Sequence, residues 1–177
     1  NEEIVHGIPS DRVVQSGDIL SLDVGAVVEG FHSDSAFSLG VGEITEEQRK
    51  LIDATRESLK AGIGQAKAGN RVGDISAAVQ AYAEPLGYGI VRQYVGHGIG
   101  RDLHEDPQVP NFGIAGRGPL LREGMTLAIE PMLNLGTWKT AVMEDGWTVV
   151  TADGSLSAHF EDTIMITSNG AEVLTSP

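Results

Sequence analysis

The chain of 177 residues contains no cysteine. This absence excludes disulfide bonds, thiol nucleophiles and cysteine-ligated zinc. Basic residues are scarce as well, because 12 lysines and arginines stand against 25 aspartates and glutamates, which gives a formal net charge of −13. Proteins that bind nucleic acid normally present a basic face, so this charge balance argues against that class. Some of the excess carboxylates are instead candidates for binding cations.

The sequence also lacks any run of the roughly 18 apolar residues that a membrane-spanning helix requires. Its first residues show no basic region followed by an apolar one, which is the pattern of a secretory signal peptide. Together with the missing cysteines, these absences predict a cytoplasmic protein without membrane contact. The hydrophobic content of 41% and the charged content of 21% are ordinary for a globular protein. The length suits one core, and we expect a single catalytic domain over residues 1–177.

The clearest strand pattern occupies residues 18–40, where apolar and polar side chains alternate on both sides of Glu29-Gly30. A two-residue turn at this dipeptide would join the two segments into a β-hairpin. If the residues that flank the turn pair with each other, Asp23 and Asp34 lie as diagonal neighbours on its polar face, roughly 7–8 Å apart. The opposite face is apolar and calls for cover by helices. Its residues are Leu20, Leu22 and Val24.

Two amphipathic helices are expected after the hairpin. Residues 45–67 carry an apolar stripe at helical spacing, and Thr45 with Gln48 forms a capping box at its start. Residues 74–86 show a second stripe, which is closed by a proline and a glycine. Both helices are predicted to cover the sheet with their apolar sides.

The second half of the chain repeats the design of the first half faintly. Gly124 precedes an alternating strand whose polar register ends at Glu130, just as a glycine precedes the strand of Asp23. A last strand over residues 157–167 carries Glu161. Each half therefore offers two carboxylates from two strands, and we predict an α+β domain of two related halves with antiparallel sheet. Shorter strands are expected at residues 2–5, 88–92, 138–150 and 172–174.

Residues 96–107, with the sequence GHGIGRDLHEDP, hold two of the five histidines. His97 stands between two glycines, and His104 follows seven residues later. Glycines at this density disfavour helix and strand alike, and they indicate backbone that adopts an unusual geometry or admits a close neighbour. An imidazole in such a place serves as a metal ligand or handles protons near neutral pH. The alternative is a glycine-rich surface turn with an incidental histidine.

Four carboxylates and one imidazole together make an oxygen-rich ligand set, which suits manganese, iron(II), cobalt or magnesium better than structural zinc. Two divalent ions would balance four carboxylates, and paired metals hold a bridging hydroxide and polarise a carbonyl in hydrolytic enzymes. His6 and His104 would remain for proton transfer and for stabilising an oxyanion. The alternative is a group of solvated acids on an exposed sheet face. The ligand set consists of Asp23, Asp34, His97, Glu130 and Glu161.

Six segments, in order and across essentially the whole chain, resemble methionine aminopeptidases. GHGIG and HEDPQV occur in looser form in prolidases and aminopeptidase P, whereas HGIP, IEPM and DGWTV point to the methionine enzymes. The resemblance implies the pita-bread fold and removal of the initiator methionine from nascent proteins. The short separation of Glu130 and Glu161 matches the first type of the family, which is typical of bacteria. The segments are His6–Pro9, Asp23–Asp34, Tyr94–Val109, Ala128–Met132, Asp145–Val149 and Ala158–Ile164.

The same resemblance implies that the five ligand positions hold two divalent metal ions. Cobalt, manganese and iron(II) are the candidates, with zinc and magnesium as further options. Asp34 and Glu161 correspond to carboxylates that bridge both ions, and Glu130 also takes the proton from the attacking water. Asp23 helps to anchor the free α-amine of the substrate.

Further positions match residues that contact the substrate in this family. His104 would steady the substrate carbonyl as negative charge builds on it, and His6 would contact the scissile amide nitrogen. Leu103 and Trp147 fall where the family builds part of its methionine pocket, and packing in the core is the alternative role for both. The histidines assigned to structure or surface are His32 and His159.

Two departures from the family pattern are visible. The family normally has a segment before the position of Asn1, which contributes to the methionine pocket and covers the first sheet. We expect this segment to be missing here, unless a second chain supplies it in trans, so that apolar surface on the hairpin is partly bare. Asp162 stands where many relatives have histidine, but alternation turns it away from the face of Glu161, so we expect little effect on catalysis.

The expected partners are the N-terminal peptides of nascent proteins, with association with the ribosome as a further expectation. Two alternative functions stay open. One is a proline-directed peptidase of the same fold, which cleaves Xaa-Pro peptides rather than peptides that begin with Met-Ala. The other is a folded metal-binding fragment, or a binding module, with little activity of its own.

Overall fold

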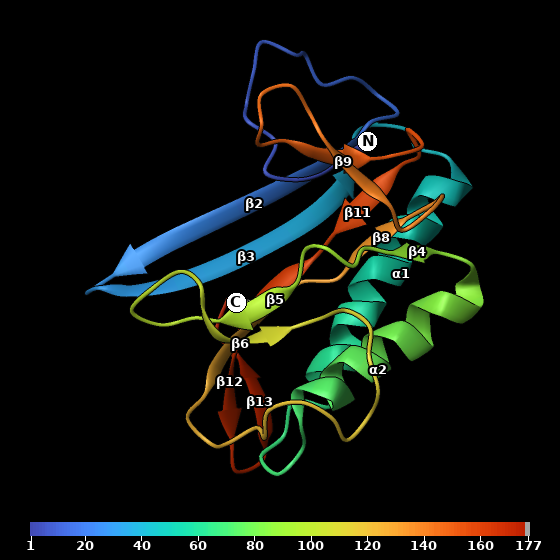
Figure 1. Cartoon of the computed structure of the whole chain (residues 1–177). Helices are drawn as coiled ribbons and strands as arrows, with labels where there is room; N and C mark the ends of the chain where they lie inside the picture. The colour runs from blue at the N-terminus through green and yellow to red at the C-terminus, as the bar shows by residue number, and fades with distance from the viewer. Residues whose placement is uncertain (176–177) are drawn as a thin grey trace.

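The computed structural model describes residues 1–175 of the chain. Within this range thirteen strands and two α-helices are arranged in three sheets and one helical layer (Figure 1). The elements in chain order are β1 (Glu3–Val5), β2 (Ile19–Val28), β3 (Phe31–Gly40), α1 (Glu46–Ile63), α2 (Val72–Ala83), the 3-10 turn η1 (Glu84–Leu86), β4 (Gly89–Ile90), β5 (Gly96–Gly98), β6 (Glu105–Val109), β7 (Thr126–Ile129), β8 (Met132–Asn134), β9 (Thr140–Val142), β10 (Val149–Thr151), β11 (Ser157–His159), β12 (Glu161–Thr167) and β13 (Gly170–Val173).

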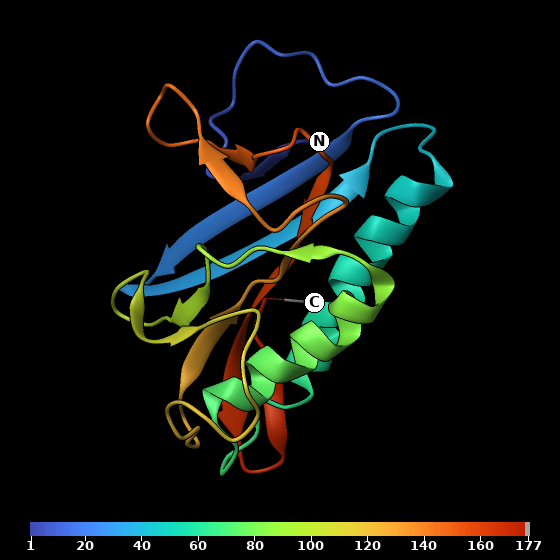
Figure 2. The same cartoon turned by 45° about the vertical axis from the view of Figure 1, so that its right-hand side comes forward.

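The largest sheet has the strand order β2-β3-β12-β7-β5-β6, and β13 pairs with β12 outside this path. The two smaller sheets have the orders β1-β10-β9 and β11-β8-β4. Both helices lie side by side along one side of the strands (Figure 2). Leu51 of α1, Ile75 of α2, Leu127 of β7 and Ile164 of β12 are fully buried in one cluster, which confirms that the helices cover the sheet. No helix within residues 1–175 combines the length and the apolar character that crossing a membrane takes.

The predicted hairpin forms with the predicted register. Val28 pairs with Phe31, and Asp23 therefore pairs with Ala36. Both turn residues of Glu29-Gly30 have positive φ, +53° and +82°. This is the conformation that a tight two-residue hairpin turn requires, because its twist matches that of the two strands.

The first helix differs from its predicted range at its C-terminal end, and the second differs at both ends, since α2 ends at Ala83 and the 3-10 turn η1 follows. Thr45 and Gln48 form the predicted capping box, but α1 ends at Ile63 and not at residue 67, because tight three-residue turns take over after Gly64. The second helix begins at Val72, two residues earlier than predicted. Its Asp74 is the third helical residue, and the carboxylate accepts a hydrogen bond from the Arg71 N–H at 2.7 Å.

The glycine-dense stretch around His97 is a strand, which corrects the expectation that such glycines disfavour one. Gly96 pairs with Val109 of β6, and Gly98 pairs with Leu127 of β7. A Cβ atom at Gly96 or Gly98 would overlap a carbonyl oxygen of a neighbouring strand. The predicted close neighbour is therefore the backbone of β6 and β7, and glycine is needed so that the strands can approach.

The last long strand is divided between two sheets. β11 pairs with β8, and β12 pairs with β3 and β7, with Phe160 between them. The Phe160 N–H donates to the Pro131 oxygen at 3.3 Å across the break. The sequence alternation predicts one continuous strand and misses this change of sheet, which brings His159 and Glu161 into one site from two sheets.

The apolar face of the hairpin is partly bare, as expected. Leu22 is 38% exposed and Val24 is 63% exposed, so the expectation that helices cover this face is wrong at these two positions. Within residues 1–175, β3 pairs with β12 at Ser35 and Ala36, which lie opposite Val24 and Asp23 of β2. Beyond these residues the hairpin extends past the sheet and the helices (Figures 1 and 2).

Candidate metal centre and active site

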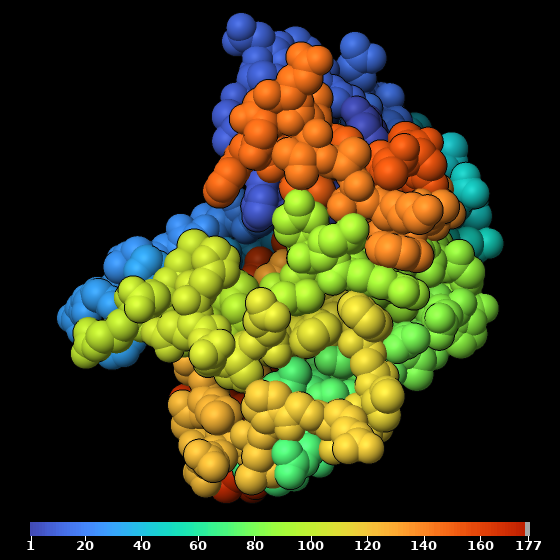
Figure 3. Space-filling model, viewed as in Figure 1, coloured from blue at the N-terminus to red at the C-terminus, as the bar shows by residue number. Residues whose placement is uncertain are grey.

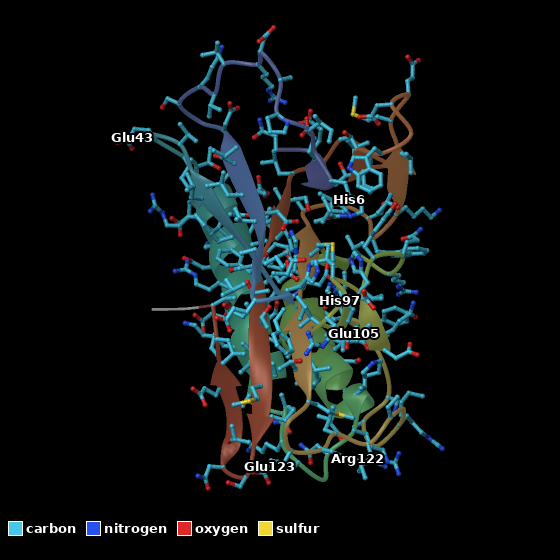
Figure 4. The ribbon with its side chains drawn as sticks, turned by 90° about the vertical axis from the view of Figure 1, so that its left-hand side faces the viewer. His6, Glu43, His97, Glu105, Arg122 and Glu123 are labelled. Carbon is cyan, nitrogen blue, oxygen red and sulfur yellow. The ribbon has the colours of Figure 1, made fainter. Side chains whose placement is uncertain are left out.

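The five predicted ligands come from five consecutive strands of the large sheet. Asp23 lies on β2, Asp34 on β3, Glu161 begins β12, Glu130 follows β7 directly, and His97 is the middle residue of β5. Pairing holds these strands in register, since Glu161 and Asp23 both pair with Ala36. Figure 4 shows His97 and His6 along the same side of the molecule. The strand order therefore collects residues that are up to 138 positions apart.

The side chains of these residues converge on one point. Donor atoms of Asp34, His97 and Glu161 all lie within 4.8 Å of one another. The Asp23 and Asp34 carboxyl groups are close enough to share a hydrogen bond. The Nε2 atom of His97 is 3.6 Å from Oε1 of Glu130. The structure thus brings all five residues together, with three of them forming the tightest group.

Three of the four acids, Asp23, Glu130 and Glu161, are costly to keep charged in this place. Burial, and then the charges of Glu130, Asp34 and Asp23, raises the pKa of Glu161 to about 10. Burial and the Asp34 charge also raise the pKa of Asp23, to about 6, and the pKa of Glu130 is raised well above its usual value, mainly by burial. Within residues 1–175 no lysine or arginine forms an ion pair with any of these acids. The group therefore lacks the positive charge that would let it ionise.

Two observations test whether a cation fits here. The buried Oε1 atom of Glu161 has no hydrogen-bond partner among the described residues, which is a costly state for a carboxylate oxygen. The Nδ1 atom of His97 lies 2.9 Å from the Gly98 oxygen and donates to it, which leaves the Nε2 lone pair facing the acids. An oxygen-rich set with one such imidazole suits a divalent cation, so the residues fit the predicted metal site.

Neighbouring polar groups orient two of the acids. The Thr163 hydroxyl donates to the main-chain oxygen of Asp34 at 2.7 Å, and the main-chain N–H of Asp34 donates back to the same hydroxyl at 2.9 Å. The Asn111 side-chain amide donates to the main-chain oxygen of Glu130 at 3.0 Å. These contacts hold the backbone from which the carboxylates project, and such supporting contacts are what metal sites depend on for geometry.

The two non-ligand histidines of the prediction flank the acid group. The His104 ring packs edge-on against the His97 ring, with centroids 4.4 Å apart. His6 adopts a left-handed backbone, with φ of +62°, and stacks on Trp147 with centroids 4.9 Å apart. Burial, with a smaller effect of His104, lowers the pKa of His6, so its imidazole is neutral near pH 7. A neutral imidazole can donate one hydrogen bond and accept another.

Two hollows are lined by residues of the site, and the surface is visibly indented between the N-terminal part and the green segment in Figure 3. One pocket of about 540 Å³ is lined by His6, Asp23 and Trp147 together with the first residues of the chain. The other, of about 450 Å³, is lined by His97 and His104. Trp147, one of the two residues predicted for a substrate pocket, lines the first of these hollows. Leu103 is half-buried in the loop before His104 and does not line the first pocket.

His159 is the site residue that sequence reasoning missed. It is 1% exposed, lines the larger pocket, and places Nε2 3.8 Å from Oε2 of Glu130. Neither ring nitrogen has a hydrogen-bond partner among residues 1–175, and burial lowers the pKa of this imidazole to about 3. Ser38 anchors its backbone through hydrogen bonds of 2.9 and 3.0 Å. The available signal was its position two residues before Glu161, on the same face of an alternating strand.

Comparison with known proteins agrees with this geometry. The model of metallopeptidase family M24 matches residues 1–168. Methionine aminopeptidase of Clostridium acetobutylicum is 54% identical over 176 residues, which are 99% of this chain and 70% of that protein. Methionine aminopeptidase 1 of Bacillus subtilis is 52% identical over 175 residues, 99% of this chain and 71% of that protein.

Comparison with solved structures also finds a methionine aminopeptidase, and it finds a prolidase at lower similarity. The crystal structure of methionine aminopeptidase from Thermotoga maritima superposes with a TM-score of 0.98 at 54% identity, over 100% of this chain and 72% of that one. Prolidase from Pyrococcus furiosus superposes with a TM-score of 0.78 at 28% identity, over 97% of this chain and 45% of that one. The predicted pita-bread fold is thereby confirmed. The chain belongs to metallopeptidase family M24 and, within that family, to the type I methionine aminopeptidases.

Proposed function

We propose that this chain is a metal-dependent aminopeptidase that removes the N-terminal methionine from proteins and peptides. The observation that carries the proposal is the convergence of four carboxylates and His97 from five neighbouring strands, in a chain 54% identical to a methionine aminopeptidase over 99% of its length. Because both halves of the chain contribute ligands, we treat residues 1–177 as one catalytic domain.

We assign Asp23, Asp34, His97, Glu130 and Glu161 as the ligands of two divalent cations. Four carboxylates carry four negative charges when ionised, and two divalent ions match that number. The candidates are manganese, iron(II) and cobalt, with zinc and magnesium as further options. Asp34 and Glu161 belong to the tightest donor group, which supports their assignment as the carboxylates shared by both ions. Bound divalent ions supply an activated water and polarise the carbonyl that it attacks.

The remaining steps are assigned to the residues that surround the cations. Glu130 faces the acid group from the end of β7, and we assign to it the proton given up by the attacking water. His104 packs against His97 at the rim of the second hollow, where it can donate a hydrogen bond to a carbonyl that gains negative charge. His6 lies across the site, and we assign to it the contact with the nitrogen of the cleaved amide.

The pocket beside Asp23 is proposed to receive the methionine side chain. Trp147 and His159 line this pocket together with Asp23, which would help to bind the substrate's α-amine there. Nascent proteins are the substrates that this activity implies. Association with the ribosome would have to rest on protein contacts, because the net charge of −13 disfavours binding to nucleic acid.

The test is metal-dependent release of methionine from a Met-Ala-Ser peptide by the chain alone. The protein is stripped with a chelator and supplied with manganese or cobalt. We expect release that His97→Ala abolishes, and no cleavage of an Xaa-Pro peptide. Cleavage of the Xaa-Pro peptide instead would favour a proline-directed peptidase. A folded chain that binds metal without releasing methionine would contradict the proposal and leave a fragment that depends on a further segment supplied in trans.

A further inference from the structure

His104 lies in a loop that has no regular secondary structure. This loop, Gly100–His104, connects β5 to β6 and stands at the surface. Within it the Gly100 N–H donates to the main-chain oxygen of Asp102 at 3.2 Å, and the Asp102 N–H donates to the Glu105 carboxylate at 3.0 Å. These short-range contacts shape the loop, but they do not connect it to the strands that carry the carboxylates.

The tip of the β2–β3 hairpin lies directly against this loop. In Figure 1 the tip reaches past the sheet to the segment between β5 and β6, and in Figure 3 the two form a single projection from the body of the molecule. Among residues 1–175, the only strand pairing of the hairpin tip beyond Ser35 is between β2 and β3, and a two-stranded hairpin alone is marginally stable in water. The tip and the loop therefore depend on each other for a fixed position.

Two contacts join the hairpin tip to the loop, and the turn residue Gly30 lies close to one of them. The His32 N–H donates to the Gly100 oxygen at 2.7 Å. The Arg101 guanidinium lies over the Phe31 ring, 4.5 Å from its centroid. A Cβ atom at Gly30 would come within 3.7 Å of the same guanidinium, so the arginine covers the turn closely. A hydrogen bond and a cation–π contact on adjacent residues determine both the position and the orientation of the loop backbone.

We propose that the hairpin tip positions His104, and that Arg101 and Phe31 are the positioning residues through which it does so. The hairpin carries Asp23 near its middle and Asp34 two residues beyond His32, and it contacts the His104 loop at its tip. One rigid element thus sets the distance between the metal ligands and the imidazole that faces the substrate carbonyl. The inference rests on the proposed function, because that function makes His104 a catalytic residue.

Loss of the contact should affect turnover more than binding. Without Arg101 over Phe31 the loop keeps its internal hydrogen bonds and the bond between the His32 N–H and the Gly100 oxygen, but it loses the side-chain contact that fixes its orientation against the hairpin tip. His104 would then spend less time where a developing oxyanion needs a donor, while the methionine pocket on the other side of the site stays intact. We therefore expect a lower kcat with a nearly unchanged KM and unchanged metal content.

The experiment compares Arg101→Met with the wild type on the Met-Ala-Ser peptide, in the normal background and in His104→Ala. Methionine keeps an unbranched apolar side chain and removes only the cation. We expect kcat to fall about tenfold or more, in line with the cost of small misplacements of catalytic groups. In the His104→Ala background the same substitution should change kcat less than about twofold, because residues that act through one another are not additive. Arg101→Lys should restore part of the activity.

The matched control is Arg56→Met, because Arg56 also lies over an aromatic ring, that of Phe160, 5.7 Å from the centroid, but on α1. This control should leave kcat unchanged. An equal loss of kcat from Arg101→Met with and without His104 would overturn the proposal, as would an equal loss from Arg56→Met. Phe31→Leu provides a second route to the same loss of contact if Arg101→Met does not fold.

A readout without turnover separates this inference from the proposed function. The His104 imidazole signals are observed by NMR and assigned by their absence in His104→Ala. Arg101→Met should shift or broaden them, and Arg56→Met should not. If the wild type releases no methionine, the proposed function fails, and the NMR result still decides the placement of the loop. Unchanged His104 signals in folded Arg101→Met would refute the positioning role.

Discussion

The two halves of the molecule supply two carboxylates each to the same site, but in different surroundings. Asp23 and Asp34 stand on a hairpin that leaves the sheet, and Asp23 keeps contact with solvent. Glu130 and Glu161 come from the centre of the sheet, and Glu161 is only 3% exposed. The pKa of Asp23 rises to about 6, whereas that of Glu161 rises to about 10, because burial weakens solvation of the second carboxylate far more.

This difference indicates which acid depends most on a cation. A buried carboxylate with an unpartnered oxygen has no other means of ionising, while a partly solvated one retains water. The site therefore combines an inner pair, which needs the metal most, with an outer pair on the hairpin that leaves the sheet. Four experiments probe this contrast.

The largest effect is expected from the inner pair. Glu161→Gln should lower metal affinity and kcat/KM by more than about 100-fold, which is the upper end of the cost of losing an outer-shell partner. Asp23→Asn should lower metal affinity and kcat/KM by roughly 10–100-fold, the usual cost of losing an outer-shell partner. Metal affinity measured by calorimetry and methionine release from Met-Ala-Ser provide the comparison. A larger loss from Asp23→Asn than from Glu161→Gln would reverse the order of the two halves.

The second effect is an unusual pH dependence of the metal-free protein. An acid whose pKa is raised on folding binds its proton more tightly in the folded state, so the free energy of unfolding falls as pH rises from the unfolded to the folded pKa. The pH range over which stability falls therefore runs from 3.8 to about 6 for Asp23 and from 4.5 to about 10 for Glu161. We expect the melting temperature without metal to be at least about 5 °C lower at pH 9 than at pH 5, given roughly 2–4 °C per kcal/mol for a domain of this size.

Differential scanning calorimetry across this range measures the dependence. Glu161→Gln should remove most of the slope above pH 6. Asp23→Asn should remove the part below pH 6 and also reduce the slope above it, because the Asp23 charge helps to raise the pKa of Glu161. Saturation with manganese should flatten the whole curve, because the cation binds the ionised form. A metal-free protein whose stability rises steadily from pH 5 to pH 9 would contradict the shifts in both halves.

A smaller effect is expected at the contact between the two halves. Thr163 on β12 exchanges two hydrogen bonds with the Asp34 backbone on β3, so Thr163→Val should weaken metal binding roughly tenfold, the lower end of the cost of outer-shell changes. Thr55→Val is the matched control, since Thr55 is also fully buried but bonds the Leu51 oxygen within α1. Equal losses of metal affinity in both variants would show a general loss of stability instead.

The smallest effect is expected on the bare face of the hairpin. Val24→Thr changes a side chain that is 63% exposed, so the free energy of unfolding should change by less than about 0.5 kcal/mol. Leu127→Ala, at a fully buried position of β7, should cost about 2–5 kcal/mol by comparison. Urea unfolding followed by circular dichroism measures both. A loss above 1 kcal/mol at Val24 would mean that this face is covered in solution.

Features that depend on near neighbours in the chain could be predicted from the sequence. The hairpin turn at Glu29-Gly30, its register and the capping box at Thr45 rest on local backbone geometry and hydrogen bonds. The alternation that sets Asp23 and Glu130 on polar faces is equally local. The family likeness, with the fold that it implies, was also readable, because its motifs are short and lie in order along the chain.

Other features depend on which distant segments meet. The break at Phe160, the strand form of Gly96–Gly98 and the burial of His159 follow from strand order and from approach between strands far apart in the sequence. Alternation alone does not encode that order, because any polar face is compatible with several neighbours. The sequence by itself therefore indicated which residues belong to the site. Tertiary pairing and burial decided how close their side chains lie to one another, how far the pKa values of the acids rise, and that the hairpin tip contacts the His104 loop.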